Sequence, residues 1–346
     1  MKKTGLVRRI SILLLLIYIS GVFTACSSKK ESKNSAVRVA HFPNITHSQA
    51  LIGRAEGQFQ KAIGEDNKIE WKVFNAGPAE IEAFFAGEVD IGYIGPGPAI
   101  NGYSRSKGEL QIVAGATNAG AILVSRRDLT IRNVKELSGK KVAVPQFGNT
   151  QDLSLRNLLK ENGLRDAAKG GDVEIRQADN PDIKILLDKG DIDAALVPEP
   201  WGSRLIKEVG AKVVLDFNRI WRGGEYSTAV VVVRTAFLEE YPDLVEKFIK
   251  AHVELTEYIN KNIDTAKQTV NAQIELLTKK PLSKDILDES FKRLTVTYSP
   301  EKDSVIGFVD LSVENGFLRQ RPEIKNIFNL EILNKVLKEK GLSEVG

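Results

Sequence analysis

Small polar side chains gather in residues 41–50 (HFPNITHSQA), which join a short apolar run to a helical pattern. Asn44 or Thr46 can cap that helix, because short side chains that carry an oxygen accept hydrogen bonds from its first backbone N–H groups. N–H groups left without a partner attract anions, and the helix dipole adds to the attraction. The loop is therefore a candidate anion site, although taken alone an ordinary helix cap explains it better.

A second segment, QFGNTQDLSLRNLL at 146–159, repeats this arrangement. It follows the apolar run KVAVPQ (141–146), bends at Gly148, and starts a helix at Asn149 and Thr150. The helix has one apolar face that can pack on a sheet, formed by Leu155, Leu158 and Leu159. Two such helix starts facing one cleft would form a pocket of backbone N–H groups and Asn, Thr and Gln side chains around an oxyanion.

Neither loop contains a lysine or an arginine, and the nearest one, Arg156, lies more than a turn into the second helix. Recognition would rest on fixed neutral donors, which suits an anion that never becomes protonated. Hydrogen bonds to a charged ligand contribute about 1.5–3 kcal/mol each, so about three or four of them support micromolar binding after the entropic cost of association.

The segment VPEPWGSRL at 197–205 adds two larger side chains. Trp201 can cover an alkyl chain of a ligand, or it can seal its helix against the sheet. Glu199 would repel an anion unless the ligand also carries an amine; alternatively, it caps the helix at 200–209.

A short pattern occurs twice, as GEVD at 87–90 and as GDID at 190–193. Each copy follows a helical pattern and precedes an apolar run that ends at prolines, in GPGP and in PEP. Gly87 and Gly190 stand where a helix end needs a positive φ, and proline ends a strand because it cannot donate to a ladder. Ligands of open α/β sheets bind beyond the carboxyl ends of the strands, so the two proline turns are candidate opposing walls of one cleft.

Catalytic and metal-binding patterns are sparse. The three histidines are His41, His47 and His252; the first two lack a third ligand nearby, so no zinc site is expected, and His252 is expected at the boundary of the core. The chain has no G-x-S-x-G, C-x-x-C or Walker A pattern. We therefore expect neither catalytic residues, nor a metal, nor a cofactor.

Strand-like runs alternate with helical patterns from residue 37 to about 210, which predicts an α/β fold with parallel sheets covered on both faces. The run EYSTAVVVVRT (225–235) leaves the second series, and the chain is mostly helical from Pro242 onward. Two α/β lobes are expected, each with one copy of the repeated pattern.

The N-terminus has the features of a bacterial lipoprotein signal. Residues 1–25 are basic and then apolar, and they end before the single cysteine, Cys26, which resembles a lipidation site; a plain signal peptide is the alternative. The polar stretch that follows, up to residue 36, reads as a tether. The chain has 49 basic and 45 acidic residues, and without the four basic residues of the signal it is neutral, which gives no support to nucleic-acid binding.

Four loop motifs together resemble those of the solute-binding lipoproteins of the nitrate/sulfonate/taurine class of ABC importers. They are HFPNITHSQA, EVDIGYIGPGPAI, VPQFGNTQDL and PEPWGSRL, in this order, and the similarity runs from about residue 37 to 235. The resemblance implies a two-lobe periplasmic-binding-protein fold of type II, with two crossover strands and the ligand in the interlobe cleft. It implies one lobe from residues 37–118 and 229–346 and another from 119–228.

Carried over residue by residue, the resemblance implies a ligand site that both lobes share. Its members are Asn44, Thr46, His47, Gly95, Pro96, Thr117, Asn149, Thr150, Gln151, Glu199 and Trp201. The crossings would lie near 117–120 and 227–228.

The sequence thus predicts a lipid-anchored extracytoplasmic protein that captures a small organosulfonate, an alkanesulfonate or taurine, by hinge closure. Its partners would be the small anionic solute, an ABC permease with its ATPase, and the membrane through the lipid; it would act as a monomer. The alternatives are a binding protein for nitrate, bicarbonate or a thiamine-precursor pyrimidine, or a pyrimidine-synthesising enzyme on the same fold. The resemblance to the enzyme implies a cysteine-rich signature, and the single cysteine of this chain lies at the N-terminus, which weakens the enzyme hypothesis.

Overall fold

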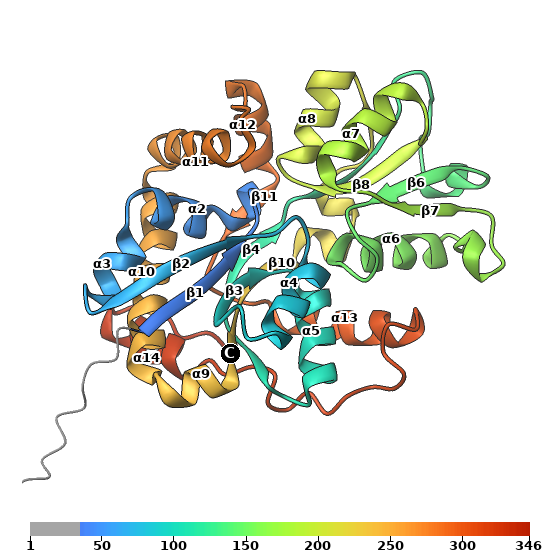
Figure 1. Ribbon diagram of the computed structural model, residues 1–346. Coiled ribbons are helices and arrows are strands. Elements are labelled where there is room, and N and C mark those ends of the chain that lie inside the picture. Colours follow the sequence, from blue (N-terminus) through green and yellow to red (C-terminus); the bar gives the residue numbers. More distant parts are fainter. Residues whose placement is uncertain (1–34) are drawn as a thin grey trace, which may run out of the picture. The chain divides into compact units, whose positions relative to one another are not determined.

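The computed structural model describes residues 35–346, and within them the chain forms two β-sheets flanked by helices (Figure 1). The predicted signal at 1–25, the lipidation site Cys26 and most of the tether lie outside the described residues. Residues 36–346 make one compact unit. Within the part that is described, no helix is both long and apolar enough to cross a membrane.

The first sheet has six strands in the order β11-β4-β10-β3-β1-β2. They are β1 (Ser35–His41), β2 (Asn67–Val73), β3 (Ile91–Ile94), β4 (Leu110–Ala119), β10 (Ser227–Arg234) and β11 (Leu294–Val296). β1 and β3 are parallel, as predicted, but β10 is antiparallel to both of its neighbours, β3 and β4. The expectation of a wholly parallel sheet is wrong because β10 enters this sheet on its way back from the second one.

The second sheet has five strands in the order β7-β6-β8-β5-β9. They are β5 (Ala121–Ser125), β6 (Lys141–Val144), β7 (Glu174–Gln177), β8 (Ala194–Pro198) and β9 (Lys212–Leu215). β6 is parallel to β7 and β8, whereas β5 is antiparallel to β8 and β9. The chain passes between the sheets twice, at Gly120 between β4 and β5 and again between β9 and β10.

Helices connect the strands in the predicted order. They are α2 (Ser48–Ala55), α3 (Gln58–Ile63), α4 (Gly77–Phe85), α5 (Pro96–Ser106), α6 (Thr150–Glu161), α7 (Asn180–Lys189) and α8 (Trp201–Val209). The helical segment that follows the first loop is divided into α2 and α3 at Gly57, whose φ of 68° is left-handed. Gly87 and Gly190 have the predicted positive φ at helix ends. The leucine face of α6 packs in the second sheet's core with Val142 and Val144, as expected.

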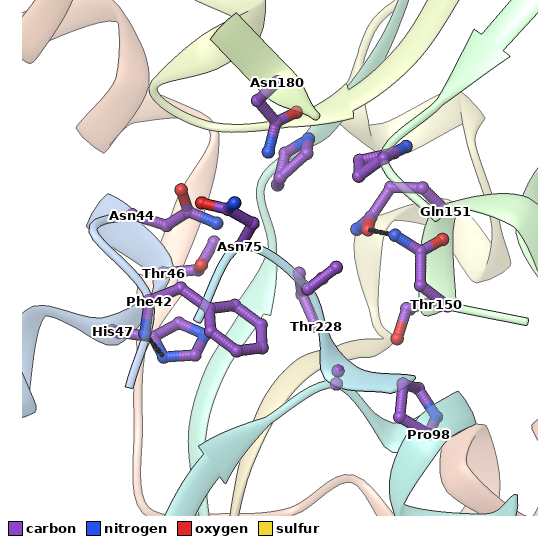
Figure 2. A pocket seen from close by; sticks show the side chains of 16 residues that line it. Phe42, Asn44, Thr46, His47, Asn75, Pro98, Thr150, Gln151, Asn180 and Thr228 are labelled. Carbon is purple, nitrogen blue, oxygen red and sulfur yellow. Dashed lines mark hydrogen bonds between the residues drawn. The ribbon is translucent and has the colours of Figure 1, made fainter. Parts of the chain in front are cut away.

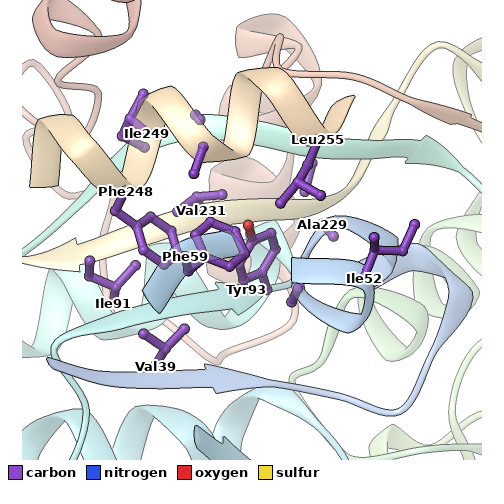
Figure 3. Packing of buried hydrophobic residues seen from close by; sticks show 14 of the residues in the cluster. Val39, Ile52, Phe59, Ile91, Tyr93, Ala229, Val231, Phe248, Ile249 and Leu255 are labelled. Carbon is purple, nitrogen blue, oxygen red and sulfur yellow. The ribbon is translucent and has the colours of Figure 1, made fainter. Parts of the chain in front are cut away.

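The C-terminal part is helical, as predicted, apart from the short strand β11. Its helices are α9 (Thr235–Glu240), α10 (Pro242–Lys261), α11 (Ile263–Thr278), α12 (Lys284–Lys292), α13 (Lys302–Glu314) and α14 (Glu331–Glu339). α10 covers one face of the first sheet, where the Phe248 ring stacks on Phe59 of α3 at 4.2 Å between centroids (Figure 3). Each fully buried side chain of this kind contributes about 1.5–3 kcal/mol to stability.

His252 of α10 belongs to this core rather than to its boundary, so that expectation is wrong. It is fully buried, accepts a hydrogen bond from the Tyr93 hydroxyl at Nδ1 (2.8 Å), and donates from Nε2 to the Gly115 carbonyl (2.9 Å). Burial lowers the pKa of His252 to about 4, which keeps the imidazole neutral. A histidine with both ring nitrogens paired packs in a core like an apolar residue.

Candidate functional site

A cavity of about 30 Å³, here called the central cavity, lies between the two sheets and is lined by segments of both (Figure 2). It lies beyond the carboxyl ends of four strands, since Phe42 follows β1, Gly95 follows β3, Pro145 follows β6 and Pro198 ends β8. This is the position at which open α/β sheets bind ligands. The two proline turns of the repeated pattern contribute Gly95 and Pro198, one from each sheet.

Seven of the predicted site residues line the central cavity. They are Asn44, Thr46, His47, Gly95, Asn149, Thr150 and Gln151. Pro96, Thr117, Glu199 and Trp201 do not line it. Pro96 is the first residue of α5, and the Thr117 hydroxyl donates to the Thr46 carbonyl (2.8 Å), so Thr117 holds the first loop in place.

Three polar residues of the lining, Asn75, Asn180 and Thr228, were not predicted. Asn75 stands two residues before α4, and Asn180 is the first residue of α7. Both therefore lie where a strand end leads into a helix start, the same pattern as at 41–50 and 146–151. That pattern could have found these two, whereas Thr228, which lies inside β10, was predicted only as part of a crossing and not as a ligand-site residue.

Five α-helices of the described part of the chain begin at the central cavity. Its lining includes the residue before α2 (His47), the first residue of α4 (Gly77), the residue before α5 (Gly95), the residue before α6 (Asn149) and the first residue of α7 (Asn180). Each helix start carries a partial positive charge of roughly half an elementary charge. None of the described residues that line the cavity is Asp, Glu, Lys or Arg. The cavity is thus electropositive although no cationic side chain contributes to it.

The first loop does not cap its helix as predicted. Neither Asn44 nor His47, the residues before the 3₁₀ turn Ile45–His47 and before α2, makes a side-chain cap hydrogen bond. The Asn44 amide oxygen instead accepts from the Trp201 indole N–H (3.1 Å), a bond that joins segments of the two sheets. In the second loop the prediction is confirmed, because the Asn149 side chain accepts the backbone N–H of Asp152 (2.8 Å).

His47 presents a neutral donor. Its Nδ1 accepts the backbone N–H of Phe42 (3.2 Å), and a neutral imidazole that accepts at Nδ1 carries its hydrogen at Nε2 (Figure 2). Burial, with a smaller contribution from His41, lowers the pKa of His47 well below its usual value. Among the described residues that line the cavity, no side chain therefore changes charge near neutral pH.

Three buried oxygens of the lining have no hydrogen-bond partner within the described residues: Thr150 Oγ1, Thr228 Oγ1 and Asn180 Oδ1. Buried polar groups are nearly always paired, so unpaired ones that line a cavity indicate a ligand or water that completes them. Thr150 comes so near Gly95 that a Cβ at this glycine would lie 2.2 Å from its hydroxyl. Only glycine permits this approach of the first sheet's turn to the start of α6.

Glu199 is turned away from the central cavity. It is fully buried, and its carboxylate accepts the Ser203 backbone N–H (2.9 Å), the Ser290 hydroxyl (3.0 Å) and Arg293 (3.4 Å). The bond to Ser203, in the first turn of α8, agrees with the prediction that Glu199 caps this helix. It does not agree with the other prediction, that Glu199 binds an amine of the ligand. Burial raises the pKa of Glu199, while these bonds act in the opposite direction.

The chain matches the model of the NMT1-like family over residues 30–275. The protein belongs to the NMT1-like family.

Among curated proteins, it is 31% identical over 63% of its length to the taurine-binding periplasmic protein of Escherichia coli, of which the match spans 65%. It is 25% identical over 97% of its length to a putative aliphatic sulfonates-binding protein of Bacillus subtilis, of which 98% is covered.

Comparison with solved structures shows the fold of this protein. The alkanesulfonate-binding protein of Xanthomonas axonopodis pv. citri, bound to MOPS, superposes with a TM-score of 0.72 at 16% identity, over 85% of this chain and 98% of that one. The periplasmic nitrate-binding protein of Synechocystis PCC 6803 gives 0.72 at 14% identity, over 88% of each chain. A desulfurization enzyme gives 0.63 at 17% identity, over 88% of this chain and 99% of that one. The fold is that of the two-lobe periplasmic binding proteins, as predicted, and it is compatible with more than one function.

Proposed function

We propose that this protein is the solute-binding component of an ABC importer and captures a small organosulfonate, an alkanesulfonate or taurine, in the central cavity. The observation that carries the proposal is the convergence of five helix N-termini on a cavity whose described lining residues include no charged side chain. Such helix starts bind anions through backbone N–H groups and the helix dipole. The ligand would contact the seven predicted lining residues together with Asn75, Asn180 and Thr228.

The donors of the site fit a sulfonate. A sulfonate has three oxygens that share one negative charge and stays ionised at physiological pH. The hydroxyls of Thr150 and Thr228 have no hydrogen-bond partner within residues 35–346, and His47 carries a hydrogen on Nε2, so neutral donors from both sheets are available. Taurine and aliphatic sulfonates also appear in the names of the two relatives described above, which supports the same ligand class.

Capture would proceed by hinge closure about the two passages between the sheets. We assign one lobe to residues 37–118 with 229–346 and the other to 119–228. Two hydrogen bonds link segments of the two lobes beside the cavity: Trp201 to Asn44 (3.1 Å) and Asn75 to Asp179 (2.9 Å). In this proposal these bonds form on closure and enclose the ligand.

We further propose that the protein works outside the cytoplasm as a monomer, anchored by a lipid on Cys26, and delivers its ligand to a membrane permease driven by a separate ATPase. It would bind its ligand without chemical conversion. The lipoprotein pattern of residues 1–26 supports the anchor, and the import systems of the family it resembles support the partners.

Thermal unfolding of residues 27–346 with a panel of anions tests the function. Methanesulfonate and taurine should raise the melting temperature in a concentration-dependent way, because a ligand that binds only the folded state stabilises it by about 2.7 kcal/mol at a hundred times its dissociation constant. Chloride at the same ionic strength is the control. A panel without any shift from sulfonates would show that the ligand class is wrong.

A second candidate ligand is nitrate or bicarbonate. The observation that favours it is the small volume of the central cavity, about 30 Å³, which suits a planar anion with four non-hydrogen atoms. The same panel separates the two ligand classes, because nitrate or bicarbonate would then shift the melting temperature and the sulfonates would not.

A further inference from the structure

A second hollow of about 370 Å³, here called the side groove, adjoins the central cavity. The two hollows share the side chains of Asn44, Asn75 and Asn180, so a single layer of asparagine side chains lies between them. The side groove is otherwise lined by segments of both sheets and of the C-terminal helices, among them Val73, Lys184, Ile185, Trp201, Leu277 and Lys280.

The walls of the side groove are largely apolar. Val73 at the end of β2 is 43% exposed, and Ile185 of α7 is 50% exposed. Trp201 and Leu277 add an aromatic and an aliphatic side chain from α8 and α11. Apolar side chains that gather in one hollow beside a binding site mark a surface that gains from being covered.

Lys184, Arg204 and Lys280 line the side groove, and none of the described lining residues is Asp or Glu. Lys184 and Arg204 both pair with Glu208, which does not line the groove. None of the described residues that line the central cavity is Asp or Glu either, and Glu199 is engaged by Ser203, Ser290 and Arg293. The nearby carboxylates of Asp179 and Glu208 are bound to Asn75 and to Lys184 and Arg204. A ligand ammonium group would therefore find no free carboxylate among the described lining residues, and an unpaired buried charge is costly.

We propose that the side groove holds the apolar body of a sulfonate whose head group lies in the central cavity, so that the protein selects alkane- or arylsulfonates over taurine. This inference rests on the proposed function and narrows its ligand class. The occupant follows from the continuity of the two hollows, from the apolar walls, and from the described lining residues, which include cations but no carboxylate to pair with an amine.

The three asparagines set the path between the hollows. Asn44 is held by the Trp201 indole and Asn75 by the Asp179 carboxylate. The Asn180 amide oxygen has no partner within the described residues. A ligand body passes between these side chains when the amides rotate, and a ligand as short as methanesulfonate leaves them in place. Length discrimination therefore takes place at this layer.

Calorimetric titration of the full-length protein with methane-, ethane-, butane- and hexanesulfonate, and with taurine, tests the inference. The affinity should rise with chain length, by about fourfold for each methylene that the groove buries, and ethanesulfonate should bind more tightly than taurine. An affinity that is flat or falls with length, or a preference for taurine over ethanesulfonate, overturns the inference. If methanesulfonate still binds, only the inference about the groove is wrong and the proposed function is retained. If no sulfonate binds, the proposed function itself is wrong.

A pair of variants localises the gain in affinity. Ile185→Ser removes an apolar wall of the groove from a side chain that is already half exposed, so the fold should be retained. Leu276→Ser is the matched control, because Leu276 is 60% exposed on α11 and does not line the groove. Ile185→Ser should reduce the ratio of hexane- to methanesulfonate affinity by at least fivefold, and Leu276→Ser should leave it unchanged. Equal ratios in both variants would overturn the assignment of the groove.

Discussion

At the scale of single residues, the candidate site is made of groups that are neutral and already fixed. Asn149 caps α6, and its amide also donates to the Gln151 side chain (3.2 Å), which sets the orientation of both. Thr150 and Thr228 are buried with hydroxyls that have no partner among residues 35–346. These hydroxyls are available to form a charge-assisted bond with a ligand and make no bond that supports the fold, so substitution can separate the effect on binding from the effect on stability.

Replacing Thr150 by valine should weaken ligand binding without weakening the fold. The valine has the same shape and removes a hydroxyl that is unpaired in the structure, so the melting temperature without ligand should stay the same or rise. A hydrogen bond to a charged ligand contributes about 1.5–3 kcal/mol, so the dissociation constant for methanesulfonate should increase at least tenfold. Calorimetry and thermal unfolding measure the two quantities.

Thr295→Val is the control for this substitution, because Thr295 is exposed on β11 and does not line the cavity. An unchanged dissociation constant in Thr150→Val would remove the start of α6 from the site. A lower melting temperature would show that the hydroxyl already has a partner in the unliganded protein.

At the scale of elements, the repeated GEVD and GDID segments have the same structural role in each sheet. Arg38 donates to the Gly87 carbonyl and pairs with Asp90, whose carboxylate also accepts the backbone N–H of Arg38 (3.0 Å). Arg126 likewise donates to the Gly190 carbonyl (2.8 Å), and Asp193 accepts the backbone N–H of Lys141 (2.9 Å). The repeat thus joins a helix end to neighbouring strands, and only the proline turns beyond it reach the cavity.

The two aspartates of this repeat should differ in their effect on stability. The Asp90 side chain is fully buried between Arg38 and Arg234, while that of Asp193 is 19% exposed and 3.7 Å from Arg126. Removing one partner of a buried ion pair costs about 3–5 kcal/mol, and a solvated pair contributes less than about 1 kcal/mol. Urea denaturation should therefore show a loss of about 3 kcal/mol for Asp90→Ala and a clearly smaller loss for Asp193→Ala. Equal losses would contradict this account of the repeat.

The order of strands and helices was predictable from the sequence because buried strands and helix faces each leave a periodic pattern. The directions of β5 and β10 were not, since they depend on where the chain passes between the sheets. β9 and β11 were missed because the first is half exposed and the second has three residues. In the candidate site, the helix starts made the Asn, Thr and Gln side chains predictable. The burial of Glu199 was not predictable, because its partners Ser290 and Arg293 belong to α12 and its end, far away in the sequence.

At the scale of the whole molecule, two sets of contacts connect the sheets: a network around Arg293 of the C-terminal part, and a hydrogen bond beside the central cavity. Glu199 and Asp216, on segments of the second sheet, are both bound by Arg293 at the end of α12, and β11 follows directly and pairs with β4 of the first sheet. This network lies at the passages between the sheets. The Trp201–Asn44 bond lies beside the cavity instead, where the proposed closure would form or break it.

Trp201→Phe should therefore weaken binding by shifting the closure equilibrium, since it removes the indole N–H that Asn44 accepts in the enclosed arrangement. A hydrogen bond has a net contribution of about 1 kcal/mol, so the dissociation constant for methanesulfonate should rise about fivefold, mainly through faster dissociation. Methanesulfonate is the right probe because it is too short to reach the side groove that Trp201 also lines. Small-angle scattering should show a larger radius of gyration for the variant than for the native protein at subsaturating ligand, and the same radius at saturation. If affinity and radius were unchanged, the Trp201–Asn44 bond would be a constant feature of the fold, and closure would have to involve other contacts between the sheets.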